Sequence, residues 1–154
     1  MISIALSSPK LSAMELRRSV SYLLSRLTIA HRNLLEKTLA EIGLHSGQAS
    51  ILIELWQKDG QRQVDIAEKL NLAPPTVNKI INGMIESELV TRRKTEGDAR
   101  STRIYLTKTG KNLEPQVKLK WEEIEEQTLM GLTKTEGLIL RQLLAKLLGE
   151  EEFD

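Results

Sequence analysis

Polar side chains recur along one face of the stretch from Pro74 to Glu86. The apolar residues of this stretch fall at helical spacing, so a set that faces inward leaves a polar face outside. The inward set is Val77, Ile80, Ile81, Met84 and Ile85, and the outward set is Pro75, Thr76, Asn78, Lys79, Asn82 and Glu86. Amide and ammonium groups near the start of a helix are the groups that hydrogen-bond to base edges in the major groove of DNA. The pattern predicts a recognition helix in which Asn78 reads adenine and Lys79 reads guanine.

A second group of candidate residues follows directly, in the basic stretch 89–106. Apolar and polar residues alternate with a period of two on both sides of Glu96-Gly97-Asp98, which is typical of a β-hairpin. A basic hairpin beside a recognition helix is the wing of a winged helix, and it contacts the DNA next to the recognition site. The predicted contacts of the hairpin are Arg92, Lys94, Asp98, Arg100, Ser101 and Arg103.

The acidic Asp98 is unexpected at the tip of a basic hairpin. It precedes Arg100 by two positions, so its carboxylate could bond loop amides or hold the arginine guanidinium oriented toward the minor groove. An ordinary turn aspartate beside a surface arginine explains the same spacing equally well. Spacing alone leaves both interpretations open.

The elements that position these residues read as a helix-turn-helix. A first helix begins near Ser46 and stops at the turn pair Asp59-Gly60. In the next stretch the small Ala67 lets a second helix cross closely, and Asn71 tolerates the left-handed backbone of a tight turn. Pro74-Pro75 fits only the first turn of the second helix, where an amide hydrogen has no partner within the helix.

Charge is segregated along the 154 residues. Residues 61–111 carry ten Lys and Arg against six Asp and Glu, whereas residues 112–154 carry five against ten. A basic middle region with neutral or acidic ends is the pattern expected of a nucleic-acid-binding module on a separate scaffold.

Apolar seams at both ends of the chain supply that scaffold. The N-terminal seam predicts one long helix and consists of Leu16, Val20, Leu23, Leu27, Ala30 and Leu34. The stretch 133–148 opens with a capping box, Thr133 to Glu136, and is apolar on more than one face. A terminal helix with so wide an apolar surface indicates a second subunit. Between the seams, the spacing predicts one amphipathic helix over about 107–128, with Trp121 packed in the core.

Several classes of chemistry are excluded. The chain has no cysteine, and His31 and His45 are its only histidines, so disulfides, thiol-based sensing and the usual zinc sites are ruled out. It has no Ser-His-Asp or Cys-His set and no glycine-rich phosphate loop, so we predict no enzyme, no metal site and no cofactor. The apolar run 2–6 is too short for a signal peptide or a membrane span. We therefore expect a cytoplasmic protein without a membrane partner.

The stretch LVTRRKTEGDARSTRIYLTKTG resembles the wing signature of the MarR family of bacterial transcriptional regulators. That signature is an Asp-x-Arg followed by a strand that ends in Leu-Thr-x-x-Gly, carried here by Asp98, Arg100, Leu106, Thr107 and Gly110. The resemblance continues upstream through LHSGQASILIEL and VDIAEKLNLAPPTVNKIINGMIESELV. It implies a homodimer with a base of N- and C-terminal helices and two winged helices that bind a pseudo-palindromic operator in double-stranded DNA. Many members are repressors that release DNA when a small, often phenolic anion binds.

Three positions depart from the family pattern. His45 stands where the family often has a capping Thr, so we expect the adjacent Ser46 to cap that helix instead. Ala73 stands where a Ser commonly caps the recognition helix, and Glu88 replaces a Gly often found just before the wing. The missing cysteine excludes the peroxide-sensing branch of the family, which needs a reactive thiol.

The sequence thus predicts a mainly α fold: a winged helix-turn-helix with a small β-hairpin wing, and terminal helices that form a dimerisation base. The expected division is 1–45 for the N-terminal part of the base, 46–107 for the DNA-binding domain and 108–154 for the C-terminal part. The predicted function is a homodimeric, sequence-specific DNA-binding transcriptional regulator, a repressor released by a small-molecule effector. The alternative is a winged helix that binds proteins and not DNA, although it leaves the polar face of Asn78, Lys79 and Asn82 unexplained.

Overall fold

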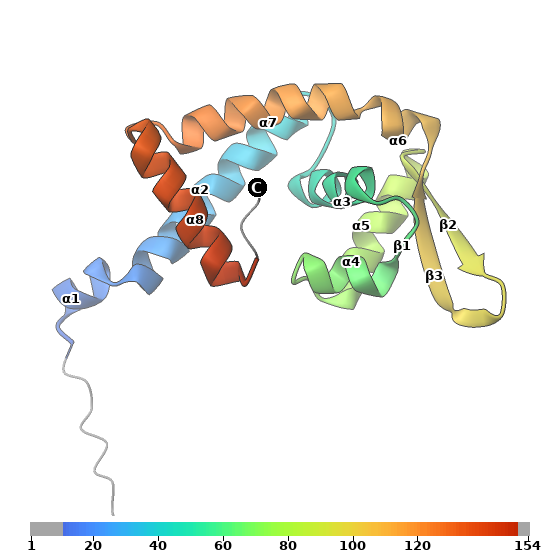
Figure 1. Cartoon of the computed structure of the whole chain (residues 1–154), viewed down its shortest axis with the longest axis horizontal. Helices are drawn as coiled ribbons and strands as arrows, with labels where there is room; N and C mark the ends of the chain where they lie inside the picture. The colour runs from blue at the N-terminus through green and yellow to red at the C-terminus, as the bar shows by residue number, and fades with distance from the viewer. Residues whose placement is uncertain (1–10, 151–154) are drawn as a thin grey trace, which may run out of the picture.

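The computed structural model describes residues 11–150, and at residues 98–100 it describes the backbone without the side chains. The fold is mainly helical (Figure 1). Its elements in chain order are α1 (Ala13–Arg18), α2 (Val20–Ala40), α3 (Ser46–Gln57), β1 (Gln61–Arg62), α4 (Gln63–Lys69), α5 (Pro74–Glu86), β2 (Val90–Thr95), β3 (Asp98–Leu106), α6 (Lys108–Asn112), α7 (Glu114–Thr128) and α8 (Lys134–Leu148). Among the helices of this part of the chain, none has both the length and the apolar composition needed to cross a membrane.

The middle of the chain forms the predicted winged helix. β2 and β3 pair antiparallel, with Val90 opposite Leu106 and Arg92 opposite Ile104, and Gly97 adopts a φ of 89° in the turn between them. The two-residue strand β1, which the sequence did not predict, pairs with the other edge of β3, so the sheet order is β1-β3-β2. In Figure 1, α4, α5 and the β2–β3 wing all lie on the same side of α7.

The connection between α4 and α5 has the backbone that its residues predict. Asn71 adopts the left-handed region with a φ of 50°. Pro74 and Pro75 occupy the first turn of α5, and Ala73 at the N-cap makes no side-chain hydrogen bond. Because proline carries no amide hydrogen, the first turn of α5 has fewer donors that need a cap, and an alanine is tolerated there.

The hydrophobic core lies inside the winged helix and extends to α2 and α7. Its buried members are Leu39, Leu44, Ala49, Ile51, Leu52, Leu55, Ile66, Ala67, Val77, Ile81, Met84, Leu89, Val90, Ile104, Val117 and Ile124. All helices from α2 to α5, both strands of the wing and α7 contribute to this one cluster. The core therefore fixes the recognition helix, the wing and the near ends of α2 and α7 relative to one another.

The junction between the wing and α6 is tightly packed around Gly110. A Cβ atom at this position would lie 2.2 Å from the carbonyl oxygen of Leu89, so no larger residue fits. On the other side, the Trp56 indole Nε1 donates a hydrogen bond to the Gly110 carbonyl at 3.1 Å. Trp56 and Trp121 also line a shallow groove of about 350 Å³ between α3 and α7.

Two helices that the sequence predicted as continuous are broken. Ser19 has an extended backbone, and its hydroxyl accepts a hydrogen bond from the Tyr22 amide at 3.2 Å, so it ends α1 and caps α2. The helix predicted over 107–128 divides at Leu113 into α6 and α7, two residues before Pro115. A proline fits the first turn of a new helix better than the interior of a long one.

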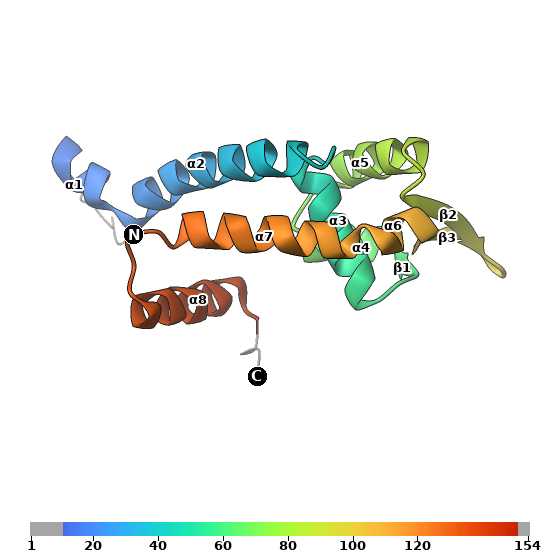
Figure 2. The ribbon, with the colours of Figure 1, turned by 90° about the horizontal axis from the view of Figure 1, so that it is seen from above.

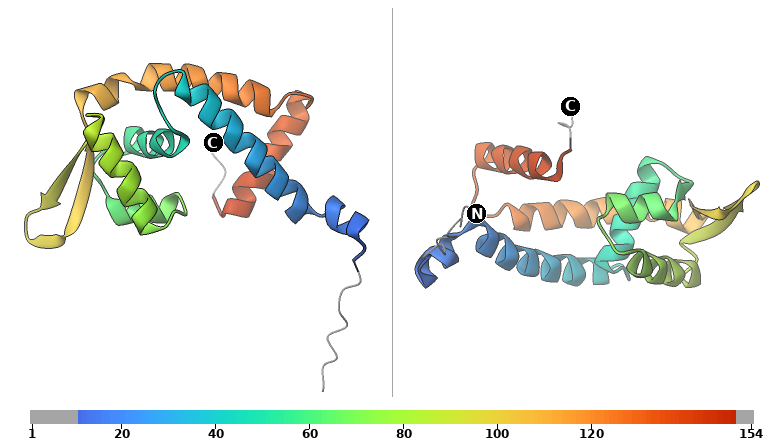
Figure 3. Two further views of the ribbon diagram at one scale, coloured as in Figure 1. Left: turned by 180° about the vertical axis from the view of Figure 1, so that it is seen from behind. Right: turned by 90° about the horizontal axis from the view of Figure 1, so that it is seen from below.

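The terminal helices present apolar side chains to solvent. Figure 2 shows α7 between α2 and α8, and Figure 3 shows the same order from below. The exposed apolar residues of the predicted seams include Leu16, Val20, Leu23, Leu27, Leu138, Ile139, Leu143, Leu144 and Leu147. The capping box from Thr133 to Glu136 is present as predicted. The described chain thus forms these helices without covering their apolar faces.

Candidate nucleic-acid interface

The recognition helix α5 turns its predicted polar face outward. Val77, Ile81 and Met84 are buried, and Ile80 and Ile85 are half-buried against the core. The exposed side chains are those of Pro75, Thr76, Asn78, Lys79, Asn82 and Glu86. The inward and outward sets from the sequence are therefore confirmed, while base contacts by the outward set stay a prediction.

The wing carries its predicted cations along β2 and β3. Arg92 and Lys94 are exposed on β2, and Ser101 and Arg103 are half-buried on β3. Arg103 has an internal partner, because its Nη1 donates to the Gly60 carbonyl at 2.7 Å. This bond ties β3 to the turn before β1, which adds a structural role to the DNA contact predicted for Arg103.

The predicted contact between Asp98 and Arg100 lies outside the described side chains. The backbone places Asp98 at the first position of β3, opposite Thr95. The turn therefore consists of Glu96 and Gly97 alone, and Asp98 belongs to the strand. Orientation of Arg100 by Asp98 stays a prediction.

A groove of about 500 Å³ runs between the wing and the starts of α4 and α5. It is lined by Arg62, Gln63, Val64, Ala67, Pro74, Asn78, Arg92, Ser101 and Thr102. Three of the predicted contact residues, Asn78, Arg92 and Ser101, thus meet here with Arg62, Gln63 and Val64, which the sequence did not single out. No local pattern marked Arg62 and Gln63, because they approach α5 only through the fold.

Arg62 and Asp65 form a bidentate ion pair at the start of α4. The guanidinium Nε donates to Asp65 Oδ2 at 2.8 Å and Nη2 donates to Oδ1 at 2.6 Å. These hydrogen bonds lower the pKa of Asp65 below its usual value. The pair fixes the side chain of Arg62, which lines one wall of the groove.

Hydrogen bonds join the wing to the recognition helix. Arg92 Nη2 donates to Asn78 Oδ1 at 3.2 Å and to Asn82 Oδ1 at 2.9 Å. Gln63 Nε2 donates to the same Asn78 oxygen at 3.4 Å. Three residues predicted to contact DNA independently are therefore one connected cluster.

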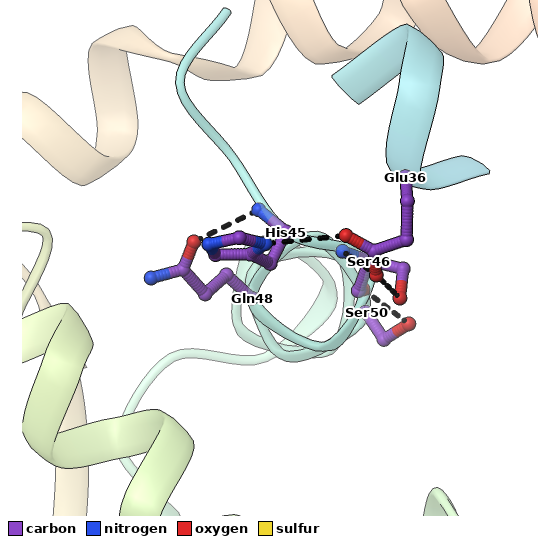
Figure 4. Close-up of polar contacts among 5 residues, drawn as sticks. All are labelled: Glu36, His45, Ser46, Gln48 and Ser50. Carbon is purple, nitrogen blue, oxygen red and sulfur yellow. Dashed lines mark hydrogen bonds and ion pairs between the residues drawn. The ribbon is translucent and has the colours of Figure 1, made fainter. Parts of the chain in front are cut away.

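The start of α3 is held by a carboxylate from α2 (Figure 4). Glu36 Oε1 accepts from the Ser46 amide at 3.0 Å and also from the Ser46 hydroxyl, and Glu36 Oε2 lies 3.2 Å from His45 Nδ1. The Ser46 hydroxyl is the main cause that lowers the pKa of Glu36. The expectation that Ser46 caps α3 is wrong: His45 occupies the N-cap position, and Glu36 accepts the free amide at the helix start.

Comparison with known proteins places this geometry in a family. Residues 44–102 match the sequence profile of the MarR family. The organic hydroperoxide resistance transcriptional regulator of Bacillus subtilis is 30% identical over 142 residues, a length that covers 90% of each chain. The chain belongs to the MarR family. It is a transcriptional regulator with a winged-helix DNA-binding fold, and its relatives are regulators rather than enzymes, in agreement with the sequence.

Solved MarR-family structures share the fold across most of the chain. A MarR transcriptional regulator from Methanosarcina mazei Go1 is 25% identical with a TM-score of 0.77, over 84% of this chain and 94% of that one. BpsR of Bordetella bronchiseptica, whose DNA binding is regulated by 6-hydroxynicotinic acid, is 24% identical with a TM-score of 0.78, over 83% and 97%. The MarR-family likeness therefore includes the terminal helices as well as the winged helix.

Proposed function

We propose that this MarR-family protein is a homodimeric repressor that binds a pseudo-palindromic DNA operator and releases it when a small anionic effector binds. The observation that carries the proposal is that the exposed polar face of α5 and the cations of the wing belong to one rigid unit. A polar helix face beside a basic hairpin matches a major groove and the DNA next to it. Since its target would be genomic DNA, the protein would act in the cytoplasm.

The exposed apolar faces of α1, α2 and α8 support the dimer. Isolated leucines at a surface are ordinary, but these form continuous seams on helices at both ends of the chain. A second copy supplies the same seams, so a two-fold arrangement would cover both faces at once. The division into a base, 1–45 and 108–154, and a DNA-binding domain, 46–107, follows from this proposal.

Each copy would contact one half of the operator. Pro75, Thr76, Asn78, Lys79 and Asn82 face the major groove in this proposal. Arg92, Lys94, Ser101 and Arg103 approach the backbone, and Arg100, with Asp98 beside it, the minor groove. Two related half-sites spaced by about one helical turn of DNA would match the two-fold axis of the dimer.

The effector of this proposal acts without a cysteine. Although a relative is named for organic hydroperoxide resistance, this chain has no cysteine, so a thiol cannot be its sensor. The regulation of BpsR by 6-hydroxynicotinic acid supports an aromatic acid as the class of effector. Arg17, Arg18 and Arg26 are three of the cations on the terminal helices that such an anion would meet in this proposal.

Selection from a random duplex library by the purified protein tests the proposal. The expected product is one palindromic site bound by a dimer. Asn78→Ala and Lys79→Ala should each lose about 1–3 kcal/mol of binding free energy on that site and much less on random DNA. Equal losses on both kinds of DNA would reduce these residues to phosphate contacts, and no enrichment of any site would favour the protein-interaction alternative.

Four variants on one selected duplex test the wing tip. Arg100→Ala should weaken binding because it removes a cation from a narrow, electronegative groove. Asp98→Ala should weaken it too if the carboxylate orients Arg100, and its effect should vanish in the double variant. If Asp98→Ala binds as tightly as the wild type or more tightly, Asp98 is a strand residue with no part in recognition.

A further inference from the structure

The hydrogen-bonded cluster of Arg92, Asn78 and Asn82 restricts what the recognition helix presents to DNA. One guanidinium nitrogen, Nη2, lies 3.2 Å from Asn78 Oδ1 and 2.9 Å from Asn82 Oδ1. An NH₂ group carries two hydrogens, so this single nitrogen serves both amides. Both asparagines belong to the exposed face of α5.

The chemistry of the guanidinium fixes the orientation of both amides. Arginine donates hydrogen bonds and cannot accept them, so the amide atom that faces Arg92 has to be the oxygen. At Asn78 a second donor, Gln63 Nε2, lies 3.4 Å from the same oxygen. An amide oxygen has two lone pairs, and at Asn78 both are in use. The Asn78 side chain therefore offers DNA its NH₂ group and not its oxygen.

We propose that Arg92 determines sequence specificity by making Asn78 a donor-only side chain that selects guanine over adenine. This inference rests on the proposed function. To read adenine, an asparagine accepts from N6 with its oxygen and donates to N7 with its nitrogen. With the oxygen occupied, the NH₂ group would meet the N6 donor of adenine, whereas guanine presents the two acceptors O6 and N7. The adenine preference expected from the sequence alone is thereby replaced.

The neighbouring Arg93 provides a matched control. It lies on the opposite face of β2, where its guanidinium is 4.8 Å from the centroid of the Tyr105 ring. Arg92→Met and Arg93→Met each remove one positive charge from the same strand. Only the first removes a hydrogen-bond donor from the two asparagine oxygens and leaves a lone pair of Asn78 Oδ1 open to adenine N6, so a difference in base preference between the two variants does not come from charge.

The binding experiment compares base preferences on a duplex selected from a random library. Asn78→Ala first identifies the position that Asn78 reads, as the one where discrimination disappears. At that position the wild type should favour guanine, Arg93→Met should keep this preference, and Arg92→Met should shift the guanine-to-adenine ratio of affinities toward adenine by about tenfold. Identical base profiles for the two arginine variants, or an adenine preference in the wild type, would overturn the inference.

A second measurement needs no DNA. The side-chain NH₂ signals of Asn78 and Asn82 in ¹⁵N NMR spectra should move in Arg92→Met and stay in place in Arg93→Met. If they stay in place in both variants, the bridge does not exist and the inference fails. A wild-type protein that selects no duplex would overturn the proposed function and the base preference together, while the NMR spectra would still decide whether the bridge forms.

Discussion

The winged helix and the terminal helices use the same apolar residue types in opposite ways. In the winged helix, Leu52, Leu55 and Ile81 are completely buried, whereas Leu143 and Leu147 on α8 are 54% and 75% exposed. The first region completes its core within one chain, and the second does not. The winged helix is therefore specified by a single chain, whereas in the proposed dimer its pairing with a second winged helix depends on a separate surface.

The helix α8 is capped at both ends. α8 begins with a capping box and ends at Gly149, whose φ of 71° is the left-handed region that favours glycine. It thus has the start and stop signals of a stable helix, although its apolar face is uncovered. The comparison separates two questions, since capping decides where α8 forms and packing decides what it binds.

The largest expected effect tests the exposed apolar face of α8. Leu143→Glu combined with Leu147→Glu should raise the dimer dissociation constant at least 100-fold, because buried unpaired carboxylates cost several kcal/mol each. Analytical ultracentrifugation would measure it. Gln142→Glu adds a charge to the same helix at an exposed polar position and should leave the dimer intact. A wild-type chain that sediments as a monomer at micromolar concentration would contradict the proposed base.

The next largest effect tests the packing of the winged helix at Gly110. Gly110→Ala should lower the free energy of unfolding by about 2–3 kcal/mol, since its Cβ would meet the Leu89 carbonyl oxygen and force the backbone apart. Urea unfolding would measure the loss. The control is Gly83→Ala, which meets no atom within 4 Å and should instead stabilise α5 by about 0.5–1 kcal/mol. Equal effects of the two changes would mean that the junction at Gly110 adjusts freely.

A smaller change in stability, this time a gain, is expected from a substitution at Glu88, just before the wing. Glu88 adopts a φ of 58°, which side chains with a Cβ disfavour, so Glu88→Gly should stabilise the fold by about 0.5–1 kcal/mol. Glu86→Gly, at the last position of α5, should destabilise it by a similar amount. Thermal unfolding of the two variants measures both changes in stability. A loss of stability in both variants would show that the left-handed backbone at Glu88 carries no strain.

The smallest expected effect on stability concerns Glu36 of α2, whose carboxylate binds the start of α3 in the winged helix. The pKa of Glu36 is lowered from 4.5, so the charged carboxylate stabilises the fold above pH 4.5, and this contribution is lost as the pH falls through the lowered pKa. Glu36→Gln should therefore be less stable than the wild type at pH 6, by under about 1 kcal/mol because the side chain is partly exposed. The difference should shrink toward pH 3 in urea titrations. A difference that is independent of pH would exclude the charge as its cause.

Sequence patterns predicted the elements of the site and not their connections. Period-two alternation gave the wing, and Asn71 with Pro74 gave the turn into the recognition helix, because each depends on neighbouring residues. The strand β1 has only two residues, too few for any periodicity to appear. The bond from Arg92 to Asn78 spans 14 positions, and that from Glu36 to Ser46 spans 10, so only the folded chain brings them together.

The helix breaks were missed for a different reason. Ser19 lies within an uninterrupted apolar seam, and periodicity outweighed the ability of a serine to cap a new helix. Pro115 was a visible signal for the break at Leu113, because proline favours a first turn over a helix interior. Both breaks show that an apolar repeat establishes a common face and does not establish a continuous helix.

The tryptophans in the groove between α3 and α7 provide an intrinsic fluorescence signal. These two tryptophans are the only ones in the chain, and both line this groove, Trp56 from the winged helix and Trp121 from α7. Indole emission depends on local polarity and quenching, so a shift of α7 against α3 changes the fluorescence of the whole protein without any attached dye. Excitation at the tryptophan band therefore reports the surroundings of the contact between the winged helix and α7, without tryptophan emission from elsewhere in the chain.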